Sequence, residues 1–164
     1  MKKGPWMTPV LAALLAVGCA GPTKENGMTL FKDDQAFLEK HTGIIVLMDK
    51  TGQRMAAVSP KLQGRIMTSS AEGPGGLSFG WINKEAIASG VNDPHMNAFG
   101  GEDRFWLGPE GGQFSLFFKK GDPFDLAHWH TPPAVNEESF ETTAKTGDRV
   151  DFVKSIRLLN YSGT

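Results

Sequence analysis

Short apolar runs separated by Gly- and Pro-rich turns occupy most of this chain. Glycine occurs 20 times and proline 10 times in 164 residues. The turn signals recur about 8–12 residues apart, which is typical of antiparallel sandwiches and barrels. We therefore predict that residues 28–164 form one mainly β domain, an antiparallel β-sandwich with one or two short helices.

Local patterns place the individual elements. Residues 33–41 have apolar positions at helical spacing behind a capping Asp33, and residues 83–89 form a shorter helix capped by Asn83. Two of the strands form a hairpin around Lys50-Thr51-Gly52. The predicted strands span residues 44–49, 54–59, 64–69, 77–81, 104–107, 113–118, 139–145 and 149–160.

The first residues are typical of an export signal. Lys2 and Lys3 precede an apolar run over residues 6–17, which is too short to span a bilayer. The tetrad Ala16-Val17-Gly18-Cys19 matches a lipobox, and Cys19 is the only cysteine. We predict a lipoprotein signal peptide over residues 1–18, lipidation of Cys19 and a polar tether over residues 19–27. The protein is then anchored in the bacterial cell envelope, on the periplasmic or outer-membrane side. The alternative is a plain secretory signal with an incidental cysteine.

Charge and motif content exclude several function classes. The formal net charge is −1, which gives no basic surface for nucleic acid. The chain contains no Gly-x-Ser-x-Gly elbow, Walker loop, dinucleotide fingerprint or His-Glu-x-x-His motif. We expect no cofactor.

The densest group of chemically active side chains lies in residues 95–112, HMNAFGGEDRFWLGPEGG. Its glycines allow close backbone approach to a ligand, its charged groups suit hydroxyl-rich ligands, and its tryptophan offers a face for a sugar ring. We predict a carbohydrate site in one concave pocket. The alternative is that the acids pair with the arginine inside a turn and the tryptophan is core. The candidate ligand-binding residues here are Asn97, Glu102, Asp103, Arg104, Trp106 and Glu110, and His95 lies in the same stretch.

A second cluster, His128-Trp129-His130, adds two histidines to the candidate ligand-binding set. On a strand, positions i and i+2 face the same side, so both imidazoles would reach one ligand or one metal ion. A catalytic zinc needs a third protein ligand, for which Glu102, Glu110 and Glu137 are the candidates. The alternative is a pair of surface histidines at the end of a sheet.

Four stretches carry a resemblance to a known family: SPKLQGRIMTSSAEG, SFGWIN, HMNAFGGEDRFWLGPEGGQFSLFF and WHTPPAVN. They resemble an uncharacterised bacterial lipoprotein family that is similar to the galactose mutarotase-like, or aldose 1-epimerase-like, β-supersandwich. Longer members continue past the stretch found here at residues 160–164, so the resemblance implies that this chain is the N-terminal part of a supersandwich.

The resemblance also implies which groups would do the chemistry. Aldose 1-epimerases use a His as general acid and a late Glu as general base. That Glu does not map onto this chain, so the catalytic candidates are His95, His128 and Glu102. The favoured function is an envelope lipoprotein domain that binds or modifies carbohydrate. The alternatives are a non-enzymatic lipoprotein that docks a protein partner and a metal-dependent hydrolase or lyase.

Overall fold

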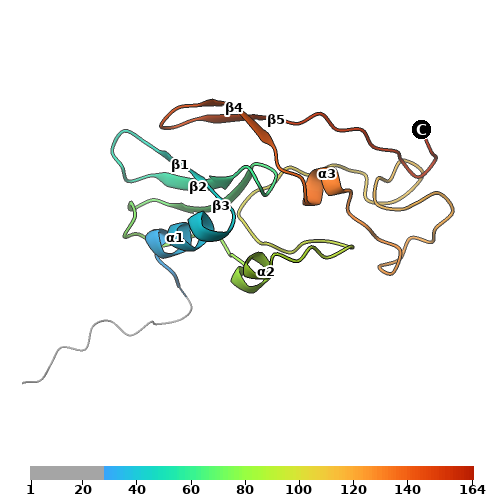
Figure 1. Cartoon of the computed structure of the whole chain (residues 1–164), viewed down its shortest axis with the longest axis horizontal. Coiled ribbons are helices and arrows are strands. Elements are labelled where there is room, and N and C mark those ends of the chain that lie inside the picture. Colours follow the sequence, from blue (N-terminus) through green and yellow to red (C-terminus); the bar gives the residue numbers. More distant parts are fainter. Residues whose placement is uncertain (1–27) are drawn as a thin grey trace, which may run out of the picture.

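A computed structural model describes residues 28–164 of the chain. The predicted signal peptide, Cys19 and the tether lie outside the described residues. Within residues 28–164 the chain forms two antiparallel sheets and three short helices (Figure 1). The predicted mainly β class with few helices is confirmed. No helix in this part of the chain has the length and apolar character needed to cross a bilayer.

The larger sheet contains three strands in the order β1 (Ile45–Met48), β2 (Met55–Ser59) and β3 (Arg65–Ser70). The hairpin predicted between the first two is confirmed. Its turn is held by Asp49, whose carboxylate accepts hydrogen bonds from the backbone of Thr51 and of the two residues that precede β2. These bonds stabilise the ionised acid and lower the pKa of Asp49, the hydroxyl of Thr51 having the largest effect.

Helix α1 (Phe31–His41) packs against β3, and it begins two residues before the predicted helix. The predicted cap at Asp33 is wrong, because the N-cap is Leu30 and no side chain caps the helix. The first amide groups of α1 instead donate to the carbonyl oxygens of Gly76 and Pro74. The helix start is therefore fixed by a tertiary contact.

The hydrophobic core lies between α1 and the three-stranded sheet. The aromatic ring of Phe31 and the side chain of Leu38 are fully buried on the inner face of α1. Ile87 adds an apolar group from α2 (Lys84–Ser89). Asn83 caps α2 as predicted, since its side chain accepts a hydrogen bond from the Ala86 amide.

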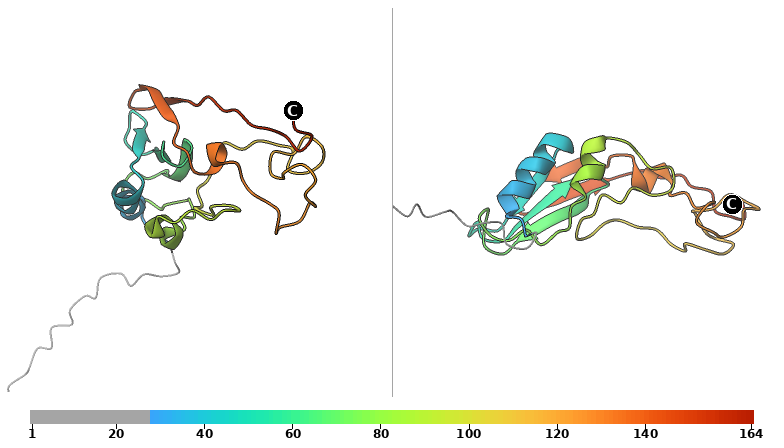
Figure 2. Two further views of the ribbon diagram at one scale, coloured as in Figure 1. Left: turned by 45° about the vertical axis from the view of Figure 1, so that its right-hand side comes forward. Right: turned by 90° about the horizontal axis from the view of Figure 1, so that it is seen from below.

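The second sheet is the hairpin β4 (Glu141–Lys145) and β5 (Val150–Val153). It lies on the side of the three-stranded sheet opposite to α1 (Figures 1 and 2). The Met48 amide donates to Gly147 at its turn. The predicted strand over 149–160 is too long: β4 offers partners for only a few residues, so the ladder ends at Val153.

The predicted strand over 77–81 is wrong as a regular element. The segment runs beside β3, but the hydroxyl of Thr68 accepts the hydrogen bond from the Gly80 amide. A side chain thus takes the place of a ladder partner. Backbone pairing in and next to this segment is limited to the bond from the Phe79 amide to the Ser69 carbonyl oxygen and to isolated bridges between Leu30 and Leu77 and between Ile82 and Gly100.

Residues 91–132 are irregular and lead into the short helix α3 (Pro133–Asn136). The strands predicted over 104–107 and 113–118 are absent from this region. Their amides bond locally instead: the Arg104 amide donates to the side chain of Asp103, and the Phe117 amide donates to the hydroxyl of Ser115. These loops form the end of the molecule that contains the candidate site (Figure 1).

Candidate functional site

The loops between α2 and α3 enclose an open hollow of about 580 Å³, which we call the aromatic hollow. Its wall comes from three segments separated in sequence, around residues 93–96, 106–110 and 126–129. The lining residues are Asp93, His95, Met96, Trp106, Glu110, Leu126 and Trp129.

A stack of aromatic rings positions the two tryptophans. The Phe117 ring is fully buried, and it stacks on Trp106 with centroids 5.1 Å apart and on Trp129 with centroids 4.5 Å apart. Phe118 packs edge-on against Trp129 at 5.6 Å. Such contacts stabilise packing beyond simple area burial, so the stack gives the hollow a rigid aromatic side.

Hydrogen bonds fix the edges of both indoles. The Trp106 Nε1 atom donates to Glu110 Oε1 over 3.0 Å, and the Trp129 Nε1 atom donates to the hydroxyl of Thr131 over 3.1 Å. The guanidinium of Arg104 also lies 4.3 Å from the Trp106 ring centroid, in a cation–π contact. Trp106 is therefore held by three different partners.

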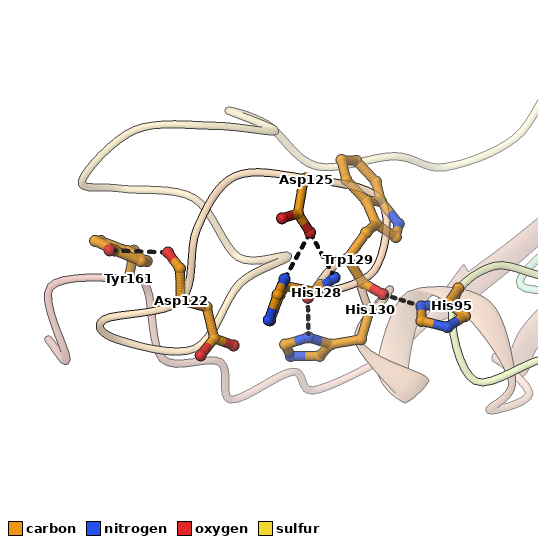
Figure 3. Close-up of polar contacts among 7 residues, drawn as sticks. All are labelled: His95, Asp122, Asp125, His128, Trp129, His130 and Tyr161. Carbon is orange, nitrogen blue, oxygen red and sulfur yellow. Dashed lines mark hydrogen bonds and ion pairs between the residues drawn. The ribbon is translucent and has the colours of Figure 1, made fainter.

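His95 is positioned by a local turn and by a distant carbonyl group. The Asp93 carboxylate accepts hydrogen bonds from the amides of Met96 and His95, and these bonds lower the pKa of Asp93. The His95 Nδ1 atom donates to the carbonyl oxygen of Trp129 (Figure 3). A carboxylate, an imidazole and two indoles thus share one wall, which suits a ligand rich in hydroxyl groups.

The His128-Trp129-His130 cluster is not on a strand, and the prediction that it is extended is wrong. Asp125 begins a turn there: its side chain accepts hydrogen bonds from the His128 amide over 3.1 Å and from His128 Nδ1 over 2.6 Å (Figure 3). The side-chain bond holds the pKa of Asp125 below its ordinary value. His128 is thus paired with a carboxylate, the arrangement that orients a proton-transferring imidazole.

The expected third metal ligand is not brought to the two histidines. Among residues 28–164, no group of three or more His, Cys, Asp or Glu side chains is placed to hold a metal ion. His130 Nδ1 lies 3.4 Å from the His128 carbonyl oxygen. Glu137 accepts a hydrogen bond from Asn92 at the end of α3.

Besides His128 and His130, four predicted ligand-binding residues do not line the aromatic hollow. Glu102 binds the amide and hydroxyl of Ser69 on β3, over 2.5 and 2.8 Å. Asp103 forms an isolated bridge with Ile66 through its backbone, and its side chain accepts from the Arg104 amide. The prediction of one pocket for the whole 95–112 segment is therefore wrong, because Glu102 and Asp103 are bonded to β3 instead.

The other two of these residues, Asn97 and Arg104, also have structural contacts. Asn97 is buried, accepts a hydrogen bond from the Asp93 amide and donates to the Asn136 carbonyl oxygen. Arg104 donates from Nη2 to the Val135 carbonyl oxygen over 2.7 Å. It touches the hollow only through Trp106. Of the residues predicted in this segment, His95, Trp106 and Glu110 do line the hollow.

Sequence reasoning missed four residues of the hollow: Asp93, Met96, Leu126 and Trp129. Trp129 lies in the His128-Trp129-His130 stretch that the sequence analysis selected. It was left out because, on the strand predicted there, its ring would face away from the two histidines. Leu126 is 85% exposed, which no local pattern predicts. The wall depends on contacts between distant loops.

This architecture defines the class: a mainly β domain with two antiparallel sheets and a loop-built aromatic hollow. The chain belongs to DUF6786, a family of unknown function whose model matches residues 29–164. Comparison with curated proteins gives no match, and comparison with solved structures gives none either.

Proposed function

We propose that the aromatic hollow binds carbohydrate. The observation that carries the proposal is that two indoles share one hollow with Glu110, Asp93 and His95. Apolar ring faces of sugars pack on aromatic side chains, while carboxylates and an imidazole accept hydrogen bonds from sugar hydroxyls. A hollow of about 580 Å³ lies in the size range of small-molecule sites.

His95 is the residue of this hollow best suited to proton transfer. Its Nδ1 donates to a carbonyl oxygen, which leaves Nε2 as the basic nitrogen of the neutral imidazole. Modification of the bound sugar, in addition to binding, would use this nitrogen. The late Glu that acts as general base in aldose 1-epimerases does not map onto this chain, and we assign no residue of the hollow to that role.

The test is a titration of the full chain with neutral hexoses and short glycans, followed by tryptophan fluorescence and thermal melting. A ligand at a hundredfold excess over its Kd stabilises the folded state by about 2.7 kcal/mol. Trp129→Ala should weaken binding at least tenfold. Trp81→Ala is the matched control, because Trp81 is an exposed tryptophan that lies outside the hollow.

A gentler variant separates a binding effect from a packing effect. Glu110→Gln keeps the shape of an exposed side chain and removes its charge, and Glu85→Gln on α2 is its control. We expect only Glu110→Gln to weaken sugar binding. If no sugar shifts the melting temperature of the folded chain, the proposal fails. If Trp81→Ala weakens sugar binding as much as Trp129→Ala, the sugar does not bind in the aromatic hollow.

We further propose that the chain is an envelope lipoprotein with a galactose mutarotase-like fold. The leader pattern and the lone Cys19 support the first part, and the four resembling stretches together with the antiparallel sheets support the second. Mass spectrometry of protein extracted from membranes should show a mature N-terminus at acylated Cys19. Cys19→Ser should abolish acylation, and an intact, unmodified Cys19 in the membrane fraction would contradict it.

A further inference from the structure

Arg65 on β3 is the largest fully buried side chain in the described part of the chain, with 2% of its surface exposed. Its Nη1 atom donates a hydrogen bond to the Gly100 carbonyl oxygen over 2.7 Å. Its Nε and Nη2 atoms are buried and have no hydrogen-bond partner among residues 28–164. Buried polar groups are nearly always paired, so this side chain requires an explanation.

The two unpartnered atoms form one edge of the guanidinium. Nε–H and one Nη2–H point in the same direction and bind the two oxygens of a carboxylate side by side. Arg149 uses this same edge on Asp151 in the present structure, over 2.7 and 2.8 Å. Arg65 therefore directs an oxyanion-binding edge into the protein interior.

A second guanidinium lies close to the first, because the antiparallel bridge between Ile66 and Asp103 places Arg104 beside Arg65. Arg104 is half-buried, and its Nε atom is buried and likewise without a partner in the described residues. Burial lowers the pKa of Arg65 to about 10, and the positive charge of Arg104 contributes to the shift. Two like charges thus approach each other in a poorly solvated region.

No acidic side chain compensates these charges within residues 28–164. The ion pairs found there involve other cations. Glu102 is bonded to Ser69, and Asp103 accepts from the backbone amide of Arg104. A buried charge without a counter-ion is strongly unfavourable, so a bound anion would relieve a large cost.

We propose that Arg65 and Arg104 form a binding site for an oxyanion, a carboxylate or phosphate group carried by a small ligand. The Nε and Nη2 atoms of Arg65 donate to two of its oxygens, and Arg104 Nε donates to one of them. This site is distinct from the aromatic hollow, which Arg104 contacts through Trp106, and the proposal does not rest on sugar binding there. Arg104 is the more exposed of the pair.

The experiment uses the full chain at pH 7 and constant ionic strength. Thermal melting is followed against increasing inorganic phosphate, glucuronate, glucose or chloride. We expect phosphate, glucuronate or both to raise the melting temperature in a saturable way, and chloride to have no such effect. A response to phosphate alone identifies a phosphate group as the ligand, and a response to glucuronate but not to glucose identifies a sugar carboxylate.

Variants locate the response. Arg104→Gln and Arg65→Met should each weaken anion binding at least tenfold, because each removes a charged donor. Arg149→Gln is the control, since Arg149 is exposed and already paired. If Arg65→Met fails to fold, Arg104→Gln still decides the matter, with circular dichroism as the check of folding. The proposal is overturned if no oxyanion gives a saturable response, or if Arg104→Gln binds as tightly as the unaltered chain.

Discussion

His95 and Trp129 are joined by a hydrogen bond from the imidazole Nδ1 to the backbone carbonyl oxygen, across 34 positions of sequence. A carbonyl oxygen only accepts, so Nδ1 carries the proton. The bond links two of the loops that line the aromatic hollow and sets the tautomer of the imidazole at the same time. The shape of the hollow and the chemistry of His95 therefore depend on one contact.

Replacing His95 tests this link. His95→Ala removes the bond, and we expect it to lower the free energy of unfolding by about 0.5–1.5 kcal/mol. Sugar binding should fall more steeply, because the hollow loses both a wall contact and a polar group. Urea unfolding and sugar titration measure the two effects. His130→Ala is the control, and equal sugar affinity in the His95→Ala and unaltered chains would contradict the assignment.

Gly100 gives a prediction about backbone packing. Its φ is +83°, and an added Cβ would lie 2.2 Å from the Trp81 carbonyl oxygen. Gly100→Ala should therefore destabilise the fold by roughly 2–4 kcal/mol. The matched control is Gly111→Ala, where a Cβ meets nothing within 4 Å. Chemical denaturation of the two variants checks this, and equal midpoints would show that the close approach is easily relieved.

Arg65 makes a prediction about pH. Burial holds its pKa in the folded protein at about 10, well below its ordinary value, so the folded state disfavours the charged form at every pH below 10. The cost is about 3 kcal/mol at neutral pH and fades as the pH rises above about 10. In buffer without oxyanions, Arg65→Met should raise the free energy of unfolding by about 1–3 kcal/mol. This figure allows for the hydrogen bond to Gly100 that the variant loses together with the buried charge.

The decisive measurement compares the free energy of unfolding of the Arg65→Met variant with that of the unaltered chain across pH. The stability difference between Arg65→Met and the unaltered chain should shrink above pH 10, because the unaltered chain is then relieved of its buried charge. A variant that is less stable than the unaltered chain at pH 7 without oxyanions would show that Arg65 is already compensated.

The Asp125–His128 pair predicts acid sensitivity of its loop. The His128 hydrogen bond lowers the pKa of Asp125, so the link is present above about pH 3.8 and is lost as the pH falls through the lower, folded-state pKa. NMR of the His128 imidazole should report loss of the bond in acid. Asp125→Asn should show the altered signal already at pH 7, whereas Asp33→Asn on α1 should not.

The local elements of this fold were largely predictable from sequence, because their determinants are local. The apolar run before Asp49 and the Thr51-Gly52 turn fix the first hairpin. Asn83 caps α2 for the same reason. The end of helix α1 at His41 was predicted, but its start at Phe31 was not, because its first amides bond to Pro74 and Gly76, which lie more than 40 residues downstream.

The candidate site was only partly predictable, because tertiary contacts decide which face of a loop is used. Phe117 belongs to an apolar run typical of a strand, yet it is held between the rings of Trp106 and Trp129. The Glu102 carboxylate is a group that could bind sugar hydroxyls, but it accepts a hydrogen bond from the Ser69 amide on β3 instead. The residue types of the 95–112 segment correctly indicated that it contributes to a site. They could not show which of its side chains line the hollow and which contact the sheet.

The contact between Arg104 and Trp106 gives the two proposed sites a common side chain. Under both proposals, an oxyanion bound at Arg104 and a sugar packed on Trp106 would act on two side chains in direct contact, so each ligand would alter how the other's side chain is held. Such coupling is reciprocal in free energy: the factor by which one ligand alters the affinity of the other is the same in both directions. A titration with a sugar that carries an acidic group would therefore test both proposed sites and the contact between Arg104 and Trp106 together.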